Sequence, residues 1–289
     1  MKPSILCWAW LATASLHGQS LADGIAAIES GRFDQAVQVF SRLVERDPEA
    51  HFYLGLAHFR AGRPGEARPA LERAVALSPD NPQAWKILGL ATTSSGDLDA
   101  ATGPLRKACD LAPADEESCY YFARNLFALG HYQAARAPFE KALRVAPQPM
   151  KARVHRAIAL NYVALDSPAD AERHFVQAIQ ASDDARVDYG AFLFRQGRTA
   201  DALKALQSAS RETPRANLEL GRVLLHAGKV EEAAASLERS VQLDPANVNA
   251  HLLLGRAYLM LGKTTEGERE LKEAAAAPPR PGNDRPSHP

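Results

Sequence analysis

Histidine and cysteine are the residue types in this chain that most readily act as bases, nucleophiles or metal ligands. The nine histidines are scattered, and none falls in a His-Glu-x-x-His pattern. Cys109 and Cys119 lack the paired spacing and histidine partners of a zinc site. No Gly-rich phosphate-binding loop is present, and no spacing brings Ser, His and Asp together. We therefore predict no catalytic residue, no metal site and no cofactor, and expect a protein that is not an enzyme.

The composition indicates which elements have to position any functional side chain. Of the 289 residues, 46% are hydrophobic and only 7% aromatic, and alanine is abundant. These values allow a packed core and favour tight helix–helix packing over a sheet. Lys plus Arg equals Asp plus Glu, at 34 each. A chain without a net basic field gives no support to an extended nucleic-acid-binding surface, and its bulk charge gives none to a membrane-surface role.

Small and apolar residues recur with a spacing of 34 along the first half of the chain. The marks that repeat are Leu54-Gly55, Leu88-Gly89 and Phe122-Ala123; Gly62, Gly96 and Gly130; Ala74, Ala108 and Ala142; and Pro79, Pro113 and Pro147. Similar marks continue to the end of the chain with slightly different spacing. A period near 34 with this pattern resembles the tetratricopeptide repeat (TPR) family.

The resemblance implies an all-α fold, a right-handed α-solenoid superhelix of about eight TPR-like helix-turn-helix units. We expect a signal peptide at 1–22, the TPR solenoid at 23–277 and a disordered Pro-rich tail at 278–289. The expected units are 23–47, 48–81, 82–115, 116–149, 150–182, 183–213, 214–247 and 248–277. No single unit can bury its apolar face alone, so stacking of the units creates the core.

Glycine and proline have separate roles in this pattern. Four glycines are predicted to let the two helices of a unit approach closely: Gly55, Gly89, Gly221 and Gly255. Six are predicted to end first helices in the left-handed conformation: Gly62, Gly96, Gly130, Gly197, Gly228 and Gly262. Prolines stop the second helices. Pro48 and Pro214 lie seven residues before the next close-approach glycine, and Pro79 lies ten before its own. We therefore expect shorter first helices after Pro48 and Pro214.

The remaining polar residues have structural interpretations. His51 and His251 occupy the place that Trp85 has in its own unit, so we interpret both as packing residues. The acidic runs Asp115-Glu116-Glu117 and Glu231-Glu232 fall at expected helix starts, where negative charge complements the helix dipole.

The family resemblance implies that ligands bind in a concave groove lined by the first helices. Counted from the Leu-Gly marks, the groove-facing residues are Lys86, Tyr120, Arg124, Phe127, Arg153, Arg156, Leu160, Phe194, Arg222, His226 and Arg256. Arginine pairs well with carboxylates, and aromatic side chains add contact area at interfaces. These residues predict a site for an acidic or C-terminal segment of a partner protein. A solvated basic face, balanced by acidic residues outside it, is the alternative.

A known TPR subclass clamps a C-terminal carboxylate with Lys and Asn. Lys86 fits that clamp, but Leu90 stands where Asn would be expected.

The N-terminus has the features of a secretory signal peptide. One Lys precedes an apolar run from Ile5 to about Leu16, which is shorter than the roughly 20 residues of a spanning helix. Cleavage before Asp23 is expected, with Thr13-Ala14-Ser15 as a second option. The mature chain would then have no membrane span. The alternative is that this segment is not a signal peptide but the start of a cytoplasmic protein.

The two remaining cysteines bear on the same question. Removal of the signal peptide leaves Cys109 and Cys119, an even number. They form either a disulfide, which exported proteins can keep, or two buried free thiols.

Two functions are compatible with these features, besides self-assembly through the ends of the array. The first is a non-enzymatic interaction scaffold or adaptor, exported to the periplasm or secreted, that binds a partner polypeptide in its groove. The second is an accessory TPR subunit of a separate enzyme system in the cell envelope, such as a glycosyltransferase or a protease.

Overall fold

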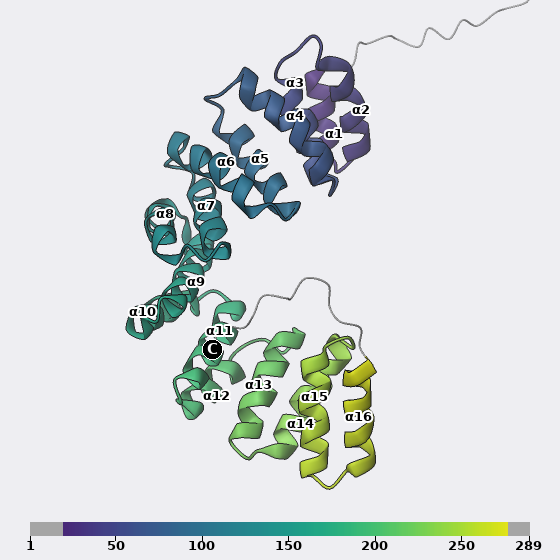
Figure 1. The fold of residues 1–289 in the computed structure, drawn as a ribbon, viewed down its shortest axis with the longest axis vertical. Coiled ribbons are helices and arrows are strands. Elements are labelled where there is room, and N and C mark those ends of the chain that lie inside the picture. The colour runs from purple at the N-terminus through teal and green to yellow at the C-terminus, as the bar shows by residue number, and fades with distance from the viewer. Residues whose placement is uncertain (1–19, 277–289) are drawn as a thin grey trace, which may run out of the picture. The chain divides into compact units, whose positions relative to one another are not determined.

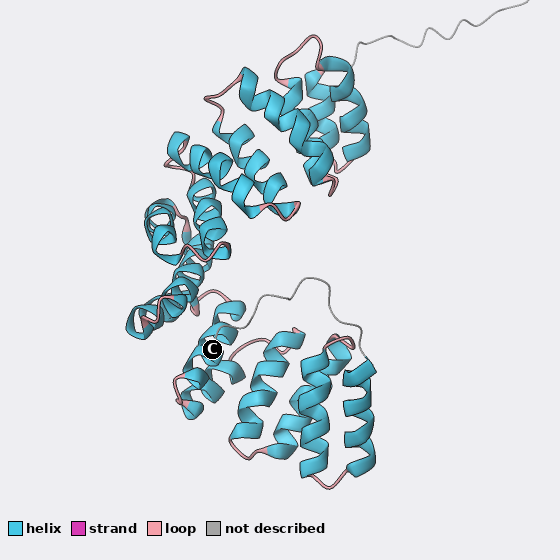
Figure 2. Ribbon diagram, viewed as in Figure 1, coloured by secondary structure: helices cyan, strands magenta, loops and turns pink. Residues whose placement is uncertain are grey.

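The computed structural model describes residues 20–276 of the chain. These residues form sixteen α-helices joined by short turns and contain no β-strand (Figure 2). The predicted all-α fold is therefore confirmed. Nearly all of the predicted signal peptide (1–22), and the whole predicted tail (278–289), lie outside the described residues.

The chain divides into two compact units, residues 1–130 and 131–289. The helices of the first unit are α1 (Leu21–Glu29), α2 (Phe33–Leu43), α3 (Ala50–Arg60), α4 (Pro64–Leu77), α5 (Pro82–Ser94), α6 (Leu98–Leu111) and α7 (Glu116–Ala128) (Figure 1). Those of the second unit are α8 (Tyr132–Val145), α9 (Gln148–Ala164), α10 (Pro168–Ala178), α11 (Asp183–Arg195), α12 (Thr199–Gln207), α13 (Pro214–His226), α14 (Val230–Leu243), α15 (Val248–Met260) and α16 (Thr264–Ala276).

Along the chain the sixteen helices follow one another as eight helix-turn-helix pairs, as the repeat pattern predicts, and the fourth, α7 and α8, is divided between the two compact units. Three residues separate the two helices of every pair, and such short connections favour antiparallel neighbours. Within each compact unit, every helix packs against the next one along the chain. The first helices of successive pairs also contact one another, α1, α3, α5 and α7 in the first unit and α9, α11, α13 and α15 in the second. We call each of these rows a first-helix layer. The arrangement within each unit is that of an α-solenoid.

The turn inside each pair depends on one residue in the left-handed conformation. All six glycines predicted for this role have positive φ angles, between 74° and 86° in five of them and 73° in Gly262. At Gly62, its own N–H bonds to the Phe59 carbonyl and the next N–H bonds to the His58 carbonyl, the Schellman arrangement. Gly31 completes the series in the first pair, and Asp166, with φ 52°, takes the place in the fifth. The sequence pattern missed Asp166 because the position is not a glycine.

The close approach predicted at Gly55, Gly89, Gly221 and Gly255 is also confirmed. A Cβ atom placed on Gly89 would lie 2.5 Å from the Leu105 side chain, and one on Gly55 would lie 2.4 Å from Leu71. Both leucines are essentially fully buried. The same contact recurs between Gly221 and Leu237 in the second unit. The first helix of a pair therefore packs its backbone against the largest core side chain of the second helix.

One expectation about helix length is wrong. Helix α13 has 13 residues, as many as α5, whereas α3 has 11. Pro214 is the first residue of α13, just as Pro82 is the first residue of α5. Pro79 instead lies in the turn after α4. Pro214 and Pro79 therefore lie at different places relative to the helix that follows each of them. Of the two first helices that were predicted to be short, only α3 is shorter than α5.

Helix α1 begins close to the predicted signal cleavage site. The Ser20 side chain accepts a hydrogen bond from the Asp23 N–H, and the Asp23 carboxylate accepts one from the Ser20 N–H at 2.8 Å. Leu21 packs against the cluster that includes Ala27 and Phe40. A mature chain beginning at Asp23 would lack this reciprocal cap and the Leu21 contact. Cleavage after Ser15 would keep both.

The close approach in the third pair predicts opposite effects of alanine at two glycines. Gly89→Ala should lower the free energy of unfolding by about 1–3 kcal/mol, because the added methyl overlaps Leu105. Gly103 lies inside α6 with no atom within 4 Å of an added Cβ. Gly103→Ala should therefore be neutral or stabilising by up to about 1 kcal/mol. Urea unfolding followed by circular dichroism measures both, and equal stability of the two variants would contradict the close-approach model.

Candidate protein-binding surface

A pocket of about 490 Å³ opens on the first-helix layer of the first unit. It is lined from α3, α5 and α7 by Phe52, Leu56, Phe59, Arg60, Gln83, Lys86, Ile87, Leu90, Glu117 and Tyr121. Of these, the sequence predicted Lys86 alone. The apolar residues on α3 could have been found by the same count, because Phe52 and Leu56 stand in the same register to Gly55 as Lys86 and Leu90 do to Gly89. A pocket whose lining includes several large apolar side chains is suited to an apolar side chain of a bound polypeptide.

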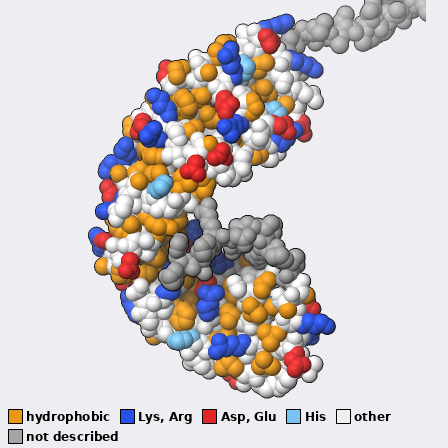
Figure 3. All heavy atoms as spheres, in the orientation of Figure 1, with side chains coloured by type: hydrophobic (Ala, Val, Ile, Leu, Met, Phe, Trp, Pro, Cys, Tyr) orange, Lys and Arg blue, Asp and Glu red, His pale blue; other side chains and the backbone are white. Residues whose placement is uncertain are grey.

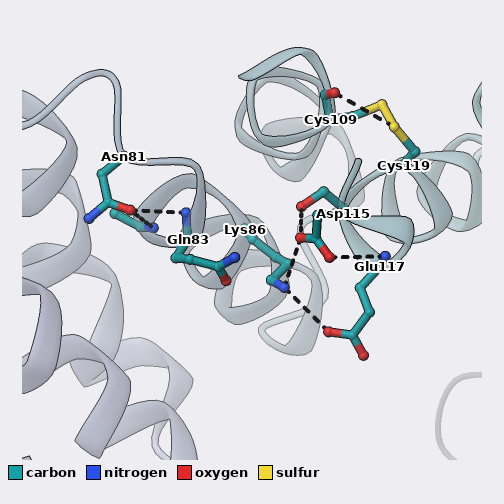
Figure 4. A network of polar contacts seen from close by, with 9 residues as sticks. Asn81, Gln83, Lys86, Cys109, Asp115, Glu117 and Cys119 are labelled. Carbon is teal, nitrogen blue, oxygen red and sulfur yellow. Dashed lines mark hydrogen bonds and ion pairs between the residues drawn. A yellow bond between two sulfur atoms is a disulfide. The ribbon is translucent and has the colours of Figure 1, made fainter. Parts of the chain in front are cut away.

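Lys86 links α5 to the start of α7. Its Nζ lies 3.0 Å from the Asp115 carboxylate and 3.3 Å from that of Glu117, and the residue is only 7% exposed (Figure 4). Asp115 is the N-cap of α7 and also accepts a hydrogen bond from the Ser118 hydroxyl at 2.6 Å. Burial raises the pKa of Asp115, but the hydrogen bonds from Ser118 and Lys86 outweigh burial and hold that pKa below its usual value. Lys86 therefore stabilises the wall of the pocket, and its charge is already compensated.

A disulfide joins Cys109 on α6 to Cys119 on α7, next to this network (Figure 4). Both cysteines are buried. Of the two alternatives that the sequence left open, the structure has the disulfide. It closes the turn that carries Asp115, so it helps to fix the helix start to which Lys86 binds.

The other predicted residues of the first unit lie on α7. Tyr120 is buried, Arg124 is exposed, and Phe127 is half-buried. The guanidinium carbon of Arg124 lies 5.7 Å from the centre of the Tyr120 ring. This cation–π contact leaves the Arg124 charge accessible to solvent.

In the second unit, a buried carboxylate holds two arginines on the first-helix layer. Asp188 on α11 is 4% exposed. It accepts a 2.6 Å hydrogen bond from Nε of Arg156 on α9, and it also pairs with Arg215 on α13. Burial opposes the charge of Arg215, but the hydrogen bond and the charge of Asp188 prevail and raise its pKa. Asp184 lies 3.6 Å from Arg156 on the exposed side. Asp188 thereby ties three successive first helices together.

The sequence predicted Arg156 but missed Asp188 and Arg215. A signal for Arg215 existed, because it precedes Gly221 by six residues, as Arg153 precedes Ala159. Asp188 falls outside the positions counted as groove-facing. Nothing in the repeat pattern of the sequence indicates that this position is buried.

The remaining predicted residues extend this surface along the same layer. Arg153 and Arg256 are exposed, and Leu160 is half-buried. Arg222 lies 3.1 Å from Glu219. Phe194 meets His226 edge-to-face, with ring centres 5.1 Å apart.

Large apolar side chains are exposed on α15, the helix that carries Arg256. Leu252, Leu259 and Met260 on α15 are 44%, 42% and 53% exposed, respectively. On the face seen in Figure 3, acidic and basic side chains are interspersed with apolar ones over the described residues. On α15, exposed apolar side chains therefore accompany Arg256.

Residues 20–276 contain neither a cluster of metal-ligating side chains nor a helix able to span a membrane. No group of three or more His, Cys, Asp or Glu residues there is arranged to hold a metal ion. None of the helices in this range has both the length and the apolar character needed to cross a bilayer.

Solved structures show where this fold occurs elsewhere. A structure of MamA is 24% identical, with a TM-score of 0.51, over 55% of this chain and 93% of MamA. A second MamA structure, labelled MSR-1, is 29% identical, with a TM-score of 0.50, over 55% of this chain and 92% of that one. Cut9–Hcn1 of the APC/C is 14% identical, with a TM-score of 0.61, over 90% of this chain and 52% of that one. The first and third of these matches show the fold alone. No significant match to a curated protein sequence is found.

Paired helices and an accessible layer of first helices define a helical-repeat protein of the kind that binds other proteins. The tetratricopeptide repeat models match residues 21–82, 54–116, 156–217, 193–248 and 224–282. The chain therefore belongs to the tetratricopeptide repeat family. Members of this family bind protein partners and are generally non-catalytic scaffolds.

The Asp188 arrangement predicts unequal effects of two substitutions on α11. Asp188→Asn should lower the free energy of unfolding by about 1–3 kcal/mol, because it leaves two arginines without a shared carboxylate. Asp184→Asn, at an exposed carboxylate, should change it by no more than about 0.5 kcal/mol. Thermal and urea unfolding measure both. Equal losses in the two variants would show that Asp188 has no special role.

Proposed function

We propose that this protein is a non-enzymatic adaptor whose first-helix layer binds an acidic segment of a partner polypeptide. The observation that carries the proposal is the run of arginines on the second unit, at positions 153, 156, 215, 222 and 256. Asp188 orients Arg156 and Arg215, while Arg153 and Arg256 are exposed at either end of the run. Arginine presents a planar fork of donors to a carboxylate, and the neighbouring apolar side chains add contact area.

The charges along this layer favour an acidic partner. Asp184, Asp188 and Glu219 pair with three of the five arginines, namely Arg156, Arg215 and Arg222. Arg256, on the same layer, is exposed to solvent. A side-chain carboxylate and a C-terminal carboxylate offer the same two oxygens, so either suits such a site.

Charge reversal at the ends of the arginine run tests this proposal. The double variant Arg153→Glu, Arg256→Glu leaves the Asp188 pairs intact and should weaken partner capture from native extract by about tenfold or more. The matched control is Arg173→Glu, Arg239→Glu, which makes the same charge change at exposed residues on the second helices α10 and α14. Capture should also weaken as salt rises.

The outcome is decided by comparing the two variants after circular dichroism has shown that both remain helical. A partner lost only with the first variant supports binding to the first-helix layer. A partner retained by both variants would contradict the assignment of the site. If the captured partner is an enzyme whose activity changes on binding, the protein is an accessory subunit rather than an adaptor.

We also propose that the protein is exported. The apolar N-terminal run followed by small residues supports this, and the buried disulfide between Cys109 and Cys119 adds to it, since such bonds persist in oxidising compartments. Cell fractionation of the full chain should find it in the envelope or the medium, with this disulfide formed in peptide mapping. A chain lacking residues 1–15 should stay in the cytosol with both thiols reduced. A full chain confined to the cytosol with reduced thiols would refute export.

A further inference from the structure

Two histidines meet inside the fifth helix pair. His155 on α9 and His174 on α10 place their Nδ1 atoms 3.0 Å apart, and their ring centres are separated by 5.1 Å. Tyr162 stacks on His174, with ring centres 5.6 Å apart. Both histidines are half-buried on packed helices, so their positions are set by the fold. Two imidazole nitrogens at this separation are held together by sharing one N–H.

The pair is accessible from outside. A pocket of about 680 Å³ adjoins it, lined by His155, Ala169, Glu172, Arg173, His174, Val176 and Gln177. Glu172 is already engaged by the Tyr189 hydroxyl at 2.8 Å and by Arg198 at 2.7 Å. The two imidazoles are thus the groups in this pocket with lone pairs suited to a soft or borderline ligand.

The corresponding place in the last helix pair provides a contrast. His251 and Glu270 occupy the same positions relative to their turn, and both are buried. His251 contacts Glu270 through Nδ1 at 2.7 Å and the Pro245 carbonyl through Nε2 at 3.0 Å. Trp85 bonds to the Pro79 carbonyl in the same way, at 2.9 Å. His251 is therefore a packing residue, as predicted, with both nitrogens occupied. The His155–His174 pair has no carboxylate in that position.

The neutral imidazole is the form that binds metal ions.

We propose that His155 and His174 form a two-histidine chelate for a divalent transition metal ion of the Cu²⁺ or Ni²⁺ type. With metal–nitrogen bonds of about 2.0–2.1 Å, a 3.0 Å nitrogen separation corresponds to an angle of about 91–97° at the metal. That angle is close to the ~90° of square-planar or octahedral sites, which Cu²⁺ and Ni²⁺ prefer to the tetrahedral geometry typical of Zn²⁺.

The protonation states are consistent with this site. The imidazole that donates its Nδ1–H to the other converts to the Nε2–H tautomer, so both Nδ1 lone pairs bind the ion and no net proton is released. Water completes the coordination, since no third His, Cys, Asp or Glu of residues 20–276 joins the pair. The site lies between the two helices of one pair, and it does not depend on binding to the first-helix layer.

Calorimetric titration of the tag-free full chain with CuCl₂ and NiCl₂ at pH 7.5 tests the site. One ion per chain is expected, and binding should raise the thermal unfolding temperature. Loss of a residue that only supports a metal site typically costs about tenfold or more in affinity. Loss of a ligand in His155→Gln or His174→Gln should therefore cost at least as much. His226→Gln, at an exposed histidine of the same compact unit, is the matched control and should bind like the wild type.

Further measurements address folding and geometry. Circular dichroism checks that each variant is folded, and electron paramagnetic resonance of the Cu²⁺ form should show two coordinated nitrogens in the wild type and one in each single variant. Equal affinity in the wild type and both variants would overturn the proposal, because the ions would then bind elsewhere in the chain. Tighter binding of Zn²⁺ than of Cu²⁺ and Ni²⁺ would overturn the assigned geometry.

Discussion

The structure depends on a contact in which the backbone of one helix lies against the core side chain of its partner. At Gly89 and Leu105, and at the equivalent glycines Gly55, Gly190, Gly221 and Gly255, a Cβ atom on the first helix would overlap the core leucine. This contact fixes the depth at which the two helices pack. Because each pair leaves apolar surface on both sides, the next pair has to stack against it. Within each unit the first helices then come to lie in a row. The row of the first unit presents the pocket, and the row of the second unit presents the arginines.

Most of the fold could be predicted from the sequence because its determinants are periodic. The spacing of 34 identified the helix pairs, and the glycines that end first helices showed where each pair turns. The sequence-based predictions failed where proline has two roles and where a residue other than glycine makes the turn. Pro214 begins a helix whereas Pro79 follows one, so the count from proline gave the wrong length for α13. Asp166 turns the chain with a positive φ angle although it is not a glycine.

The candidate surface was less accessible to sequence analysis, because periodicity tells which side a residue is on but not what it pairs with. Lys86 was predicted as a contact for a partner, yet its charge is taken up by Asp115 and Glu117. The sequence pattern did not identify Asp188, because this buried residue does not fall at a groove-facing position, although it orients two arginines. Likewise, the 3.0 Å approach of His155 and His174 joins residues 19 apart on two helices, and no short motif encodes it.

The disulfide between Cys109 and Cys119 crosses the boundary between two repeats rather than lying within one. Stacked repeats interact mainly with their neighbours, so an array can open stepwise from its ends. A covalent bond between α6 and α7 prevents the third and fourth repeats from separating at that joint. The local opening of α7 is thereby coupled to that of α6, and through Lys86 to that of α5. In an oxidising compartment these three helices therefore open as one cooperative unit. In a reducing compartment the disulfide is absent, and α6 and α7 can separate more easily at the turn around residue 112.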